Sequence, residues 1–254
     1  MNYIQLLFSP AGGTKRVAEV ITSTWRNTVK TVDLSDAADD FSAYSFAPED
    51  IVLIALPSYA GRVPGLAAER LLQVRGNSAK CVLLCVYGNR AYEDTLVEME
   101  DMAKKCGFVV AAAVSAVAKH SIMHQFASNR PDEQDIKELK AYADTILTKI
   151  NEGTFSQDLQ IPGNRPYKKA GNVGMIPKTT QDCDDCGLCA KRCPAQAIDP
   201  GKGKKTDAGK CISCMRCVSE CPHSARKVNS AMVAAASLAL KKACSVRKNS
   251  ELFC

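Results

Sequence analysis

Two cysteine-rich stretches constrain the fold of this 254-residue chain more than any other feature. They read CDDCGLCAKRCP at residues 183–194 and CISCMRCVSECP at residues 211–222, each with the spacing C-x2-C-x2-C-x3-C-P. Every cysteine of the first stretch has a counterpart 28 positions later in the second. Because cytosolic chains rarely keep disulfides, thirteen cysteines indicate metal binding, and the repeat predicts two equivalent metal-binding halves.

Zinc and iron–sulfur clusters are the two kinds of centre that these cysteines can hold. A structural zinc ion takes four ligands, usually from two separated C-x2-C pairs. Three cysteines at steps of three residues instead suit a loop wrapped around one cubane, with a fourth thiolate arriving from elsewhere. The spacing therefore favours 4Fe–4S clusters. Residues 178–228 closely resemble the bacterial two-cluster ferredoxins.

The ferredoxin resemblance implies crossed ligand sets, since in that family the fourth cysteine of each run binds the other cluster. One 4Fe–4S cluster would be held by Cys183, Cys186, Cys189 and Cys221, and the other by Cys211, Cys214, Cys217 and Cys193. Neither half should then fold alone. The lysine-rich connector 198–210 is expected to be a solvated loop or a docking point for an acidic partner. Nucleic acid is not expected as a partner, because no aromatic residue is interleaved with these lysines.

The other cysteines carry no ligand spacing. Cys81, Cys85 and Cys106 are expected to be buried free thiols. Cys244 and Cys254 fall in the tail, and the sequence assigns them no role.

Short apolar runs alternate with helical segments in the first 150 residues. Nearly unbroken apolar runs are typical of parallel strands that are covered on both faces. The pattern predicts a doubly wound, five-stranded parallel α/β sheet whose ligand binds beyond the carboxyl ends of the strands. The strands are expected at 3–8, 28–34, 51–56, 81–87 and 108–117, and the helices within 13–27, 64–76, 91–107 and 131–151.

Three unusual loops follow the first, third and fourth of these strands. The first, within FSPAGGTKRVAEV (8–20), matches neither common phosphate-loop pattern, but it offers hydroxyls, two glycines and a helix start to an anion. An ordinary strand–helix turn is the alternative. The loops within 56–65 and 87–94 are glycine-rich, and each carries a tyrosine and an arginine. Together the three loops suit a flat ligand with a phosphate tail.

Residues 2–150 resemble the flavodoxin family, and the resemblance implies bound FMN. It assigns the phosphate to a loop of Ser9, Ala11, Gly12, Gly13 and Thr14. It assigns the flavin ring to Pro57, Ser58, Tyr59, Ala60, Gly61, Arg62, Gly88, Asn89, Arg90 and Tyr92. Tyr59 and Tyr92 are the stacking candidates, with plain packing as the alternative. Ala11 stands where flavodoxins usually have threonine, and neither ring loop contains tryptophan.

A histidine follows the fifth strand on the same edge of the sheet. His120 is a candidate for a hydrogen bond to the flavin or for a proton donor, and His124 lies in the same loop. A solvated loop histidine is the alternative for both.

The composition divides the chain into two parts. We expect a flavodoxin-like domain at 1–152, a linker rich in glycine and proline at 153–177, and a ferredoxin domain with a C-terminal helix at 178–254. The net charge is −2 for residues 1–150 and +8 for residues 151–254. Opposite charges predict that the two domains attract each other across a flexible linker.

These features predict an electron-transfer protein that passes electrons between two 4Fe–4S clusters, FMN and unidentified redox partner proteins. The alternative is an FMN-dependent reductase of a small-molecule acceptor, fed by its own clusters. A structural use of the clusters leaves the three loops unexplained. The domain order resembles a flavodoxin–ferredoxin fusion family of anaerobic bacteria. We see no export signal and no apolar run of the roughly 18 residues that a membrane span needs, so a cytoplasmic protein is expected.

Overall fold

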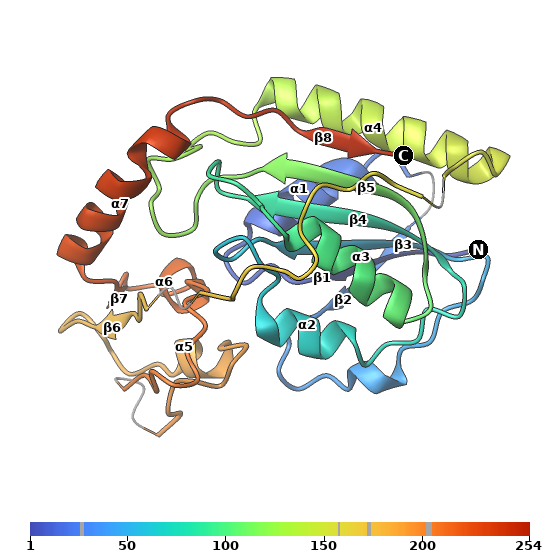
Figure 1. Cartoon of the computed structure of the whole chain (residues 1–254). Helices are drawn as coiled ribbons and strands as arrows, with labels where there is room; N and C mark the ends of the chain where they lie inside the picture. The colour runs from blue at the N-terminus through green and yellow to red at the C-terminus, as the bar shows by residue number, and fades with distance from the viewer. Residues whose placement is uncertain (26–27, 157, 172–173, 202–204) are drawn as a thin grey trace.

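A six-stranded sheet forms the core of the larger part of the molecule (Figure 1), with strand order β2-β1-β3-β4-β5-β8. The computed structural model describes residues 1–25, 28–156, 158–171, 174–201 and 205–254. Five strands are parallel, and their order 2-1-3-4-5 is that of flavodoxin-like folds, as the sequence predicted. These strands are β1 (Tyr3–Leu7), β2 (Val29–Asp33), β3 (Ile51–Pro57), β4 (Lys80–Tyr87) and β5 (Val109–Val117).

Helices cover both faces of this sheet, which explains why its strands are apolar throughout. Buried side chains of α1 (Gly13–Thr22) and α4 (Glu133–Glu152) pack with one face of the strands. Those of α2 (Gly65–Leu71), α3 (Thr95–Lys105) and the short 3-10 turn η1 (Phe41–Ala43) pack with the other. In such sheets, ligands bind beyond the carboxyl ends of the strands.

The last strand of the sheet comes from the far end of the chain. The strand β8 (Glu251–Phe253) runs antiparallel to β5, with Ser115 opposite Glu251. The Glu251 carboxylate accepts hydrogen bonds from the Ser115 hydroxyl at 2.8 Å and from the Tyr92 hydroxyl at 2.7 Å. The expected domain 178–254 therefore ends too late, because its last residues belong to the first sheet. A three-residue strand is too short to show a pattern in the sequence.

The cysteine-rich part is a small α+β unit at the carboxyl edge of the sheet (Figure 1). Its elements are α5 (Leu188–Lys191), α6 (Arg216–Ser219) and the antiparallel pair β6 (Lys178–Thr179) and β7 (Arg226–Lys227). The helix α7 (Ser230–Cys244) follows and leads the chain back to β8. No helix among the described residues is long and apolar enough to cross a membrane.

The sequence repeat is also a repeat of backbone conformation. Three pairs of left-handed residues lie 28 positions apart, and they place the same turns in both halves. The pairs are Asp185 and Ser213, Gly187 and Met215, and Gln196 and Ser224.

The linker lies against α3 along part of its length. The Arg165 guanidinium pairs with Asp101 at 2.7 Å and with Glu100 at 2.9 Å. Asn164 donates its backbone and side-chain N–H groups to Asp94, at 2.9 Å each. The expectation of a flexible tether is therefore wrong for this segment. Residues 157 and 172–173 of the linker, 26–27 of the first predicted helix and 202–204 of the connector lie outside the described residues.

Two buried arginines cross from one part to the other. Arg216 of α6 donates to the backbone oxygen of Pro10 at 3.3 Å and to that of Ser35 at 3.4 Å. Arg70 of α2 donates in the other direction, to the backbone oxygen of Pro194 at 2.7 Å. A buried guanidinium needs such partners, because an unpaired buried charge is costly. The two parts therefore meet in a fixed interface.

His120 organises the loop that follows β5. Its Nδ1 accepts hydrogen bonds from the backbone N–H groups of Ile122 and Met123, at 3.1 Å each. The ring lies against Gly88, where a Cβ atom would come within 2.6 Å of it. Burial, with the neighbouring His124 as a smaller cause, lowers the pKa of His120 to about 4. The ring is therefore neutral at pH 7, and its Nδ1 is a structural acceptor.

The packed interface predicts a shape that does not respond to salt. We expect the radius of gyration, measured by small-angle X-ray scattering, to be the same at about 0.05 and 0.5 M NaCl, although screening shortens to a few ångströms over this range. Buried arginine contacts are screened far less than surface charges. A radius that grows with salt would contradict the fixed interface and restore the flexible tether.

The lowered pKa of His120 predicts a loss of stability in mild acid. In the unfolded chain, His120 binds a proton below about pH 6.5. In the folded protein the same ring stays neutral until the pH falls to about 4. The free energy of unfolding should therefore fall through this window, with a slope of up to about 1.4 kcal/mol per pH unit from this group. Anaerobic denaturant titrations of the native protein and of His120→Asn would measure it. Asparagine keeps an acceptor oxygen but does not titrate.

The free energies of unfolding of the native protein and of His120→Asn should therefore differ less at pH 5 than at pH 7. The exposed His124→Asn variant is the matched control, since it removes a histidine from the same loop. If the free energies of unfolding of the native protein and of His120→Asn differ by the same amount at every pH, His120 is not the titrating group.

Candidate functional site

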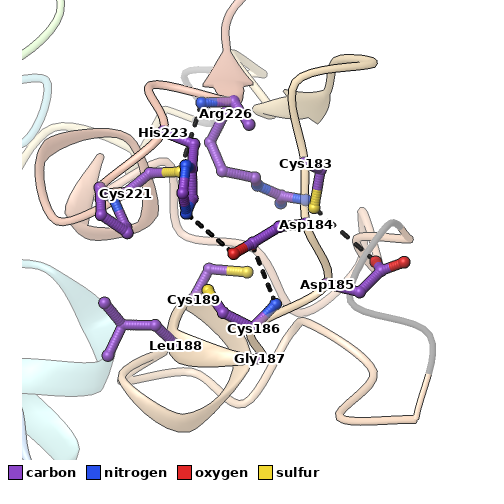
Figure 2. A pocket seen from close by; sticks show the side chains of 12 residues that line it. Cys183, Asp184, Asp185, Cys186, Gly187, Leu188, Cys189, Cys221, His223 and Arg226 are labelled. Atoms are coloured by element: carbon purple, nitrogen blue, oxygen red, sulfur yellow. Dashed lines mark hydrogen bonds and ion pairs between the residues drawn. The ribbon is translucent and has the colours of Figure 1, made fainter.

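The first group of cysteines surrounds a small cavity in the cysteine-rich part (Figure 2). Cys183 and Cys186 lie on the turn before α5, and Cys189 lies on α5 itself. Cys221, just after α6, lines the same cavity from the other half of the repeat. We call this the first cysteine cavity.

The second group also takes three cysteines from one run and the fourth from the other run. Cys211, Cys214 and Cys217 of the second run line another small cavity, and Cys193 of the first run joins them. We call this the second cysteine cavity. The structure thus gathers the eight cysteines in the two groups that the ferredoxin resemblance implied, and each run lends its fourth member to the other group.

The exchanged cysteines are held by equivalent hydrogen bonds. The backbone N–H of Ala197 donates to the Cys193 sulfur at 3.3 Å, and that of Ala225 donates to the Cys221 sulfur at 3.3 Å. The two bonds lie 28 positions apart, as the repeat requires. N–H groups aimed at sulfur stabilise a thiolate ligand and tune the potential of a cluster.

Arg226 is a buried cation that acts on both cysteine groups. Its side chain is 2% exposed, and it donates to the Thr179 hydroxyl at 2.5 Å and to the Pro177 carbonyl at 3.3 Å. Burial raises the pKa of Cys217 to about 11, while the Arg226 guanidinium acts to lower it. Burial also raises the pKa of Cys189 in the first cavity, and Arg226 opposes that effect as well. Arg226 was not predicted from the sequence, where its one signal is a break in the repeat, since Ile198 is its counterpart.

This donor set fits two 4Fe–4S clusters. Each cavity has four thiols at its wall and an N–H group on the exchanged sulfur, and a buried cation balances the charge of anionic clusters. In the part of the chain that the structure describes, no group of three or more His, Cys, Asp or Glu side chains is placed to hold a single metal ion.

The loop after β1 has the features of an anion site. Gly12 adopts φ +84° and starts α1 without a side-chain cap or an acidic residue in the first turn. The Ser9 hydroxyl accepts from the N–H of Lys15 at 2.8 Å, and its own hydrogen remains available to a ligand. Among the described residues no acceptor is recorded for the N–H groups of Gly13 and Thr14. A Cβ atom on Gly12 would meet nothing within 4 Å, so an anion can approach the backbone closely.

The loop after β3 is a tight turn. Tyr59 and Arg62 exchange backbone hydrogen bonds of 2.9 and 3.1 Å, with Ala60 and Gly61 in left-handed conformations between them. The Arg62 side chain turns away, to Glu98 at 2.7 Å and over the ring of Tyr167 in the linker. Ser58, which follows Pro57 at the end of β3, shares a hydrogen bond of 2.7 Å with Thr95.

The loop after β4 is engaged by the C-terminal segment. The buried Asn89 side chain donates to the backbone oxygens of Cys244 at 2.9 Å and Val246 at 3.0 Å. Arg90 pairs with Glu93, and the Tyr92 hydroxyl donates to Glu251. The side chains of Asn89, Arg90 and Tyr92 thus have protein partners of their own, and Gly88 is covered by His120. None of the predicted flavin residues lines either cysteine cavity or the large cavity beside them.

Tyr59 links the flavin loops to the cysteine-rich part. Burial raises the pKa of its hydroxyl well above the ordinary value, and the Cys214 thiol raises it further. The Arg216 guanidinium acts in the opposite direction. Tyr59 therefore lies within electrostatic reach of the second cysteine cavity, although the two are more than a hundred residues apart in the chain.

Comparison with known proteins assigns the cysteine-rich part. Residues 182–226 match the model of the 4Fe-4S dicluster domain family. No curated protein matches the chain.

Solved structures similar to the α/β part include several flavodoxins. A flavodoxin from Streptococcus pneumoniae TIGR4 has 16% identity and a TM-score of 0.45, over 59% of this chain and 99% of that one. Oxidised Flavodoxin 1 from Bacillus cereus has 11% identity and a TM-score of 0.42, over 58% and 98%. Rubredoxin oxygen:oxidoreductase from the anaerobe Desulfovibrio gigas has 18% identity and a TM-score of 0.43, over 59% of this chain and 36% of that one.

Likeness at this level carries no argument about function, and the fold rests on the strand order. The chain thus joins an α/β domain of flavodoxin-like topology to a 4Fe-4S dicluster domain at residues 182–226.

Proposed function

We propose that this protein passes electrons between two 4Fe–4S clusters, a bound FMN and redox partners. A 4Fe-4S dicluster domain gives the chain a redox role. The observation that carries the proposal is the gathering of eight cysteines in two groups of four at the carboxyl edge of a flavodoxin-like sheet.

The cysteine groups would hold the clusters. Cys183, Cys186, Cys189 and Cys221 hold one, and Cys211, Cys214, Cys217 and Cys193 hold the other. Bound clusters supply one-electron transfer. The protein's contribution is to position the thiolates, to donate N–H groups to sulfur, and to place the Arg226 charge beside both groups.

The β1–α1 loop would hold the FMN phosphate. The N–H groups of Gly13 and Thr14 and the Ser9 hydroxyl are the donors, and the start of α1 adds its partial positive charge. FMN supplies both one-electron and two-electron chemistry when bound. Tyr59 supports this arrangement, because it follows β3 at the same edge and lies near Cys214.

His120 has no proton-donor role in this proposal. A ring that is neutral at pH 7, with Nδ1 held by two backbone N–H groups, orders its loop instead. Cluster thiolates need a reducing compartment, so a cytoplasmic location and unidentified redox partner proteins belong to the proposal. A reductase of a small-molecule acceptor remains the second candidate, because a large cavity adjoins both cysteine groups.

The crossed ligand sets predict which cluster each cysteine variant loses. The anaerobically purified protein should hold about eight iron and eight sulfide, and Cys221→Ser should retain about half. The reduced Cys221→Ser protein should lose the same electron paramagnetic resonance signal as Cys186→Ser, although Cys186 belongs to the other run. Cys217→Ser is the matched control from the run of Cys221 itself.

Identical spectra of Cys221→Ser and Cys217→Ser would refute the crossed assignment. Zinc without sulfide in the native protein would refute the clusters altogether.

The β1–α1 loop predicts a charge-specific loss of FMN. Gly12→Asp and Gly12→Asn impose the same strain at φ +84°, and they differ in one negative charge. We expect FMN to bind to the aspartate variant at least roughly tenfold more weakly than to the asparagine variant, because a carboxylate faces the phosphate. Fluorescence titration of the flavin measures the two affinities. Equal affinities would place the phosphate elsewhere, and unchanged iron content would show that both variants fold.

A further inference from the structure

A large cavity lies between the loop after β5, the segment α6–β7 and α7, and its volume is about 820 Å³. Apolar side chains form most of its wall, among them Ile122, Phe126, Met215, Val218 and Val233. This volume is within the range of small-molecule sites. The cavity is separate from the three loops assigned to FMN, since none of their residues lines it.

The wall of this cavity is formed by packed elements. Met123 and Phe126 of the loop are buried together with Cys244 of α7, and Val233 packs against them. Gln125 of the loop donates to the Ser237 hydroxyl of α7 at 2.8 Å. The site is therefore preformed on two sides.

The cavity adjoins both cysteine groups. Met215 lines it together with the second cysteine cavity, and Arg226 lines it together with the first. The large cavity thus shares one lining residue with each cysteine cavity.

Met215 is an unusual residue for its backbone conformation. It adopts φ +65°, where the first half of the repeat has Gly187. A left-handed conformation costs a residue with a side chain roughly 1–2 kcal/mol. Met215 is nevertheless buried and lines the large cavity, and a thioether is a favourable contact for an aromatic ring.

The charge of the lining favours an anion. Arg226, Lys227 and Lys241 contribute to the wall, and none of the described lining residues is acidic. The pair between Lys227 and Asp182 is 3.8 Å long and well exposed, so it competes weakly with a ligand.

We propose that this cavity binds a flat aromatic anion of small-molecule size that accepts electrons from the clusters. The inference rests on the proposed function and names the class of its acceptor. Two reduced clusters, bound by the two cysteine groups, would supply the two electrons that, with two protons from solvent, convert a quinone sulfonate to its hydroquinone.

The test uses 1,4-naphthoquinone-2-sulfonate and the cluster-loaded full chain. Equilibrium dialysis against the oxidised protein measures binding without any electron transfer. Ala234→Trp fills the cavity from α7, and Ala235→Trp is its control on the same helix but outside the lining. Lys241→Gln removes a lining charge, and Lys242→Gln removes a neighbouring charge outside the lining. All four positions are exposed, so the variants are expected to fold.

We expect Ala234→Trp to raise the dissociation constant of the probe at least roughly tenfold, since the indole takes the volume of the ligand. Lys241→Gln should raise it roughly threefold, as the loss of an exposed ion pair does. The two controls should leave it unchanged. Protein reduced with dithionite and freed of excess reductant should be reoxidised by the probe, and more slowly in Ala234→Trp.

Equal affinities of Ala234→Trp and Ala235→Trp would overturn the site. If FMN competes with the probe for binding, the proposal is also overturned, because the cavity would then be the flavin-binding site. Intact binding without reoxidation, in protein with full iron content, would overturn the acceptor role. Normal binding of the probe to native protein that contains no iron after anaerobic purification would support the site and count against the proposed function.

Discussion

The arrangement of this molecule depends on the antiparallel pairing of β8 with β5. This pairing returns the end of the chain to the sheet, and Glu251 secures it through Ser115 and Tyr92. At the other end of the cysteine-rich part, Asn164 and Arg165 fix the linker to α3. The cysteine-rich part is thus held at both ends, and its effective concentration at the interface with the α/β domain is high. It therefore loses little further conformational freedom when it docks there. Both cysteine cavities are thereby kept at the edge of the sheet where flavodoxin-like folds bind their ligand.

The two halves of the cysteine repeat differ most where they meet other elements. Met215, Arg216 and Arg226 stand where the first half has Gly187, Leu188 and Ile198. Arg216 reaches the loops after β1 and β2, Arg226 lies beside both cysteine groups, and Met215 separates the large cavity from the second group. The cysteines and the turns are kept in both halves because they form the cavities. The second half has in addition the residues that bind it to the α/β domain.

Local patterns in the sequence predicted the parts of this structure that local interactions determine. Apolar runs predicted the five parallel strands, and the ferredoxin resemblance implied the two cysteine groups. Long-range contacts could not be predicted in this way. The side chain of Asn89 was assigned to a flavin, yet it holds Cys244 and Val246, which lie more than 150 positions away. The segment SELFC has no apolar alternation to mark it as a strand, and the linker gave no sign of the acidic residues on α3 that hold it.

Equivalent cysteines of the two halves have unequal surroundings, and this gives the proposed electron transfer an order. Cys186 is exposed, whereas its counterpart Cys214 is buried beside Tyr59 of the β3 loop. Cys186 therefore gives the first cysteine group a solvent-exposed member that a partner protein could approach. The second faces the α/β domain, where Arg216 closes the interface. A partner would thus exchange electrons with the first cluster site, and the second would connect it to the flavin loops. Arg226, buried beside both groups, would stabilise the negative charge of a cluster held by either one.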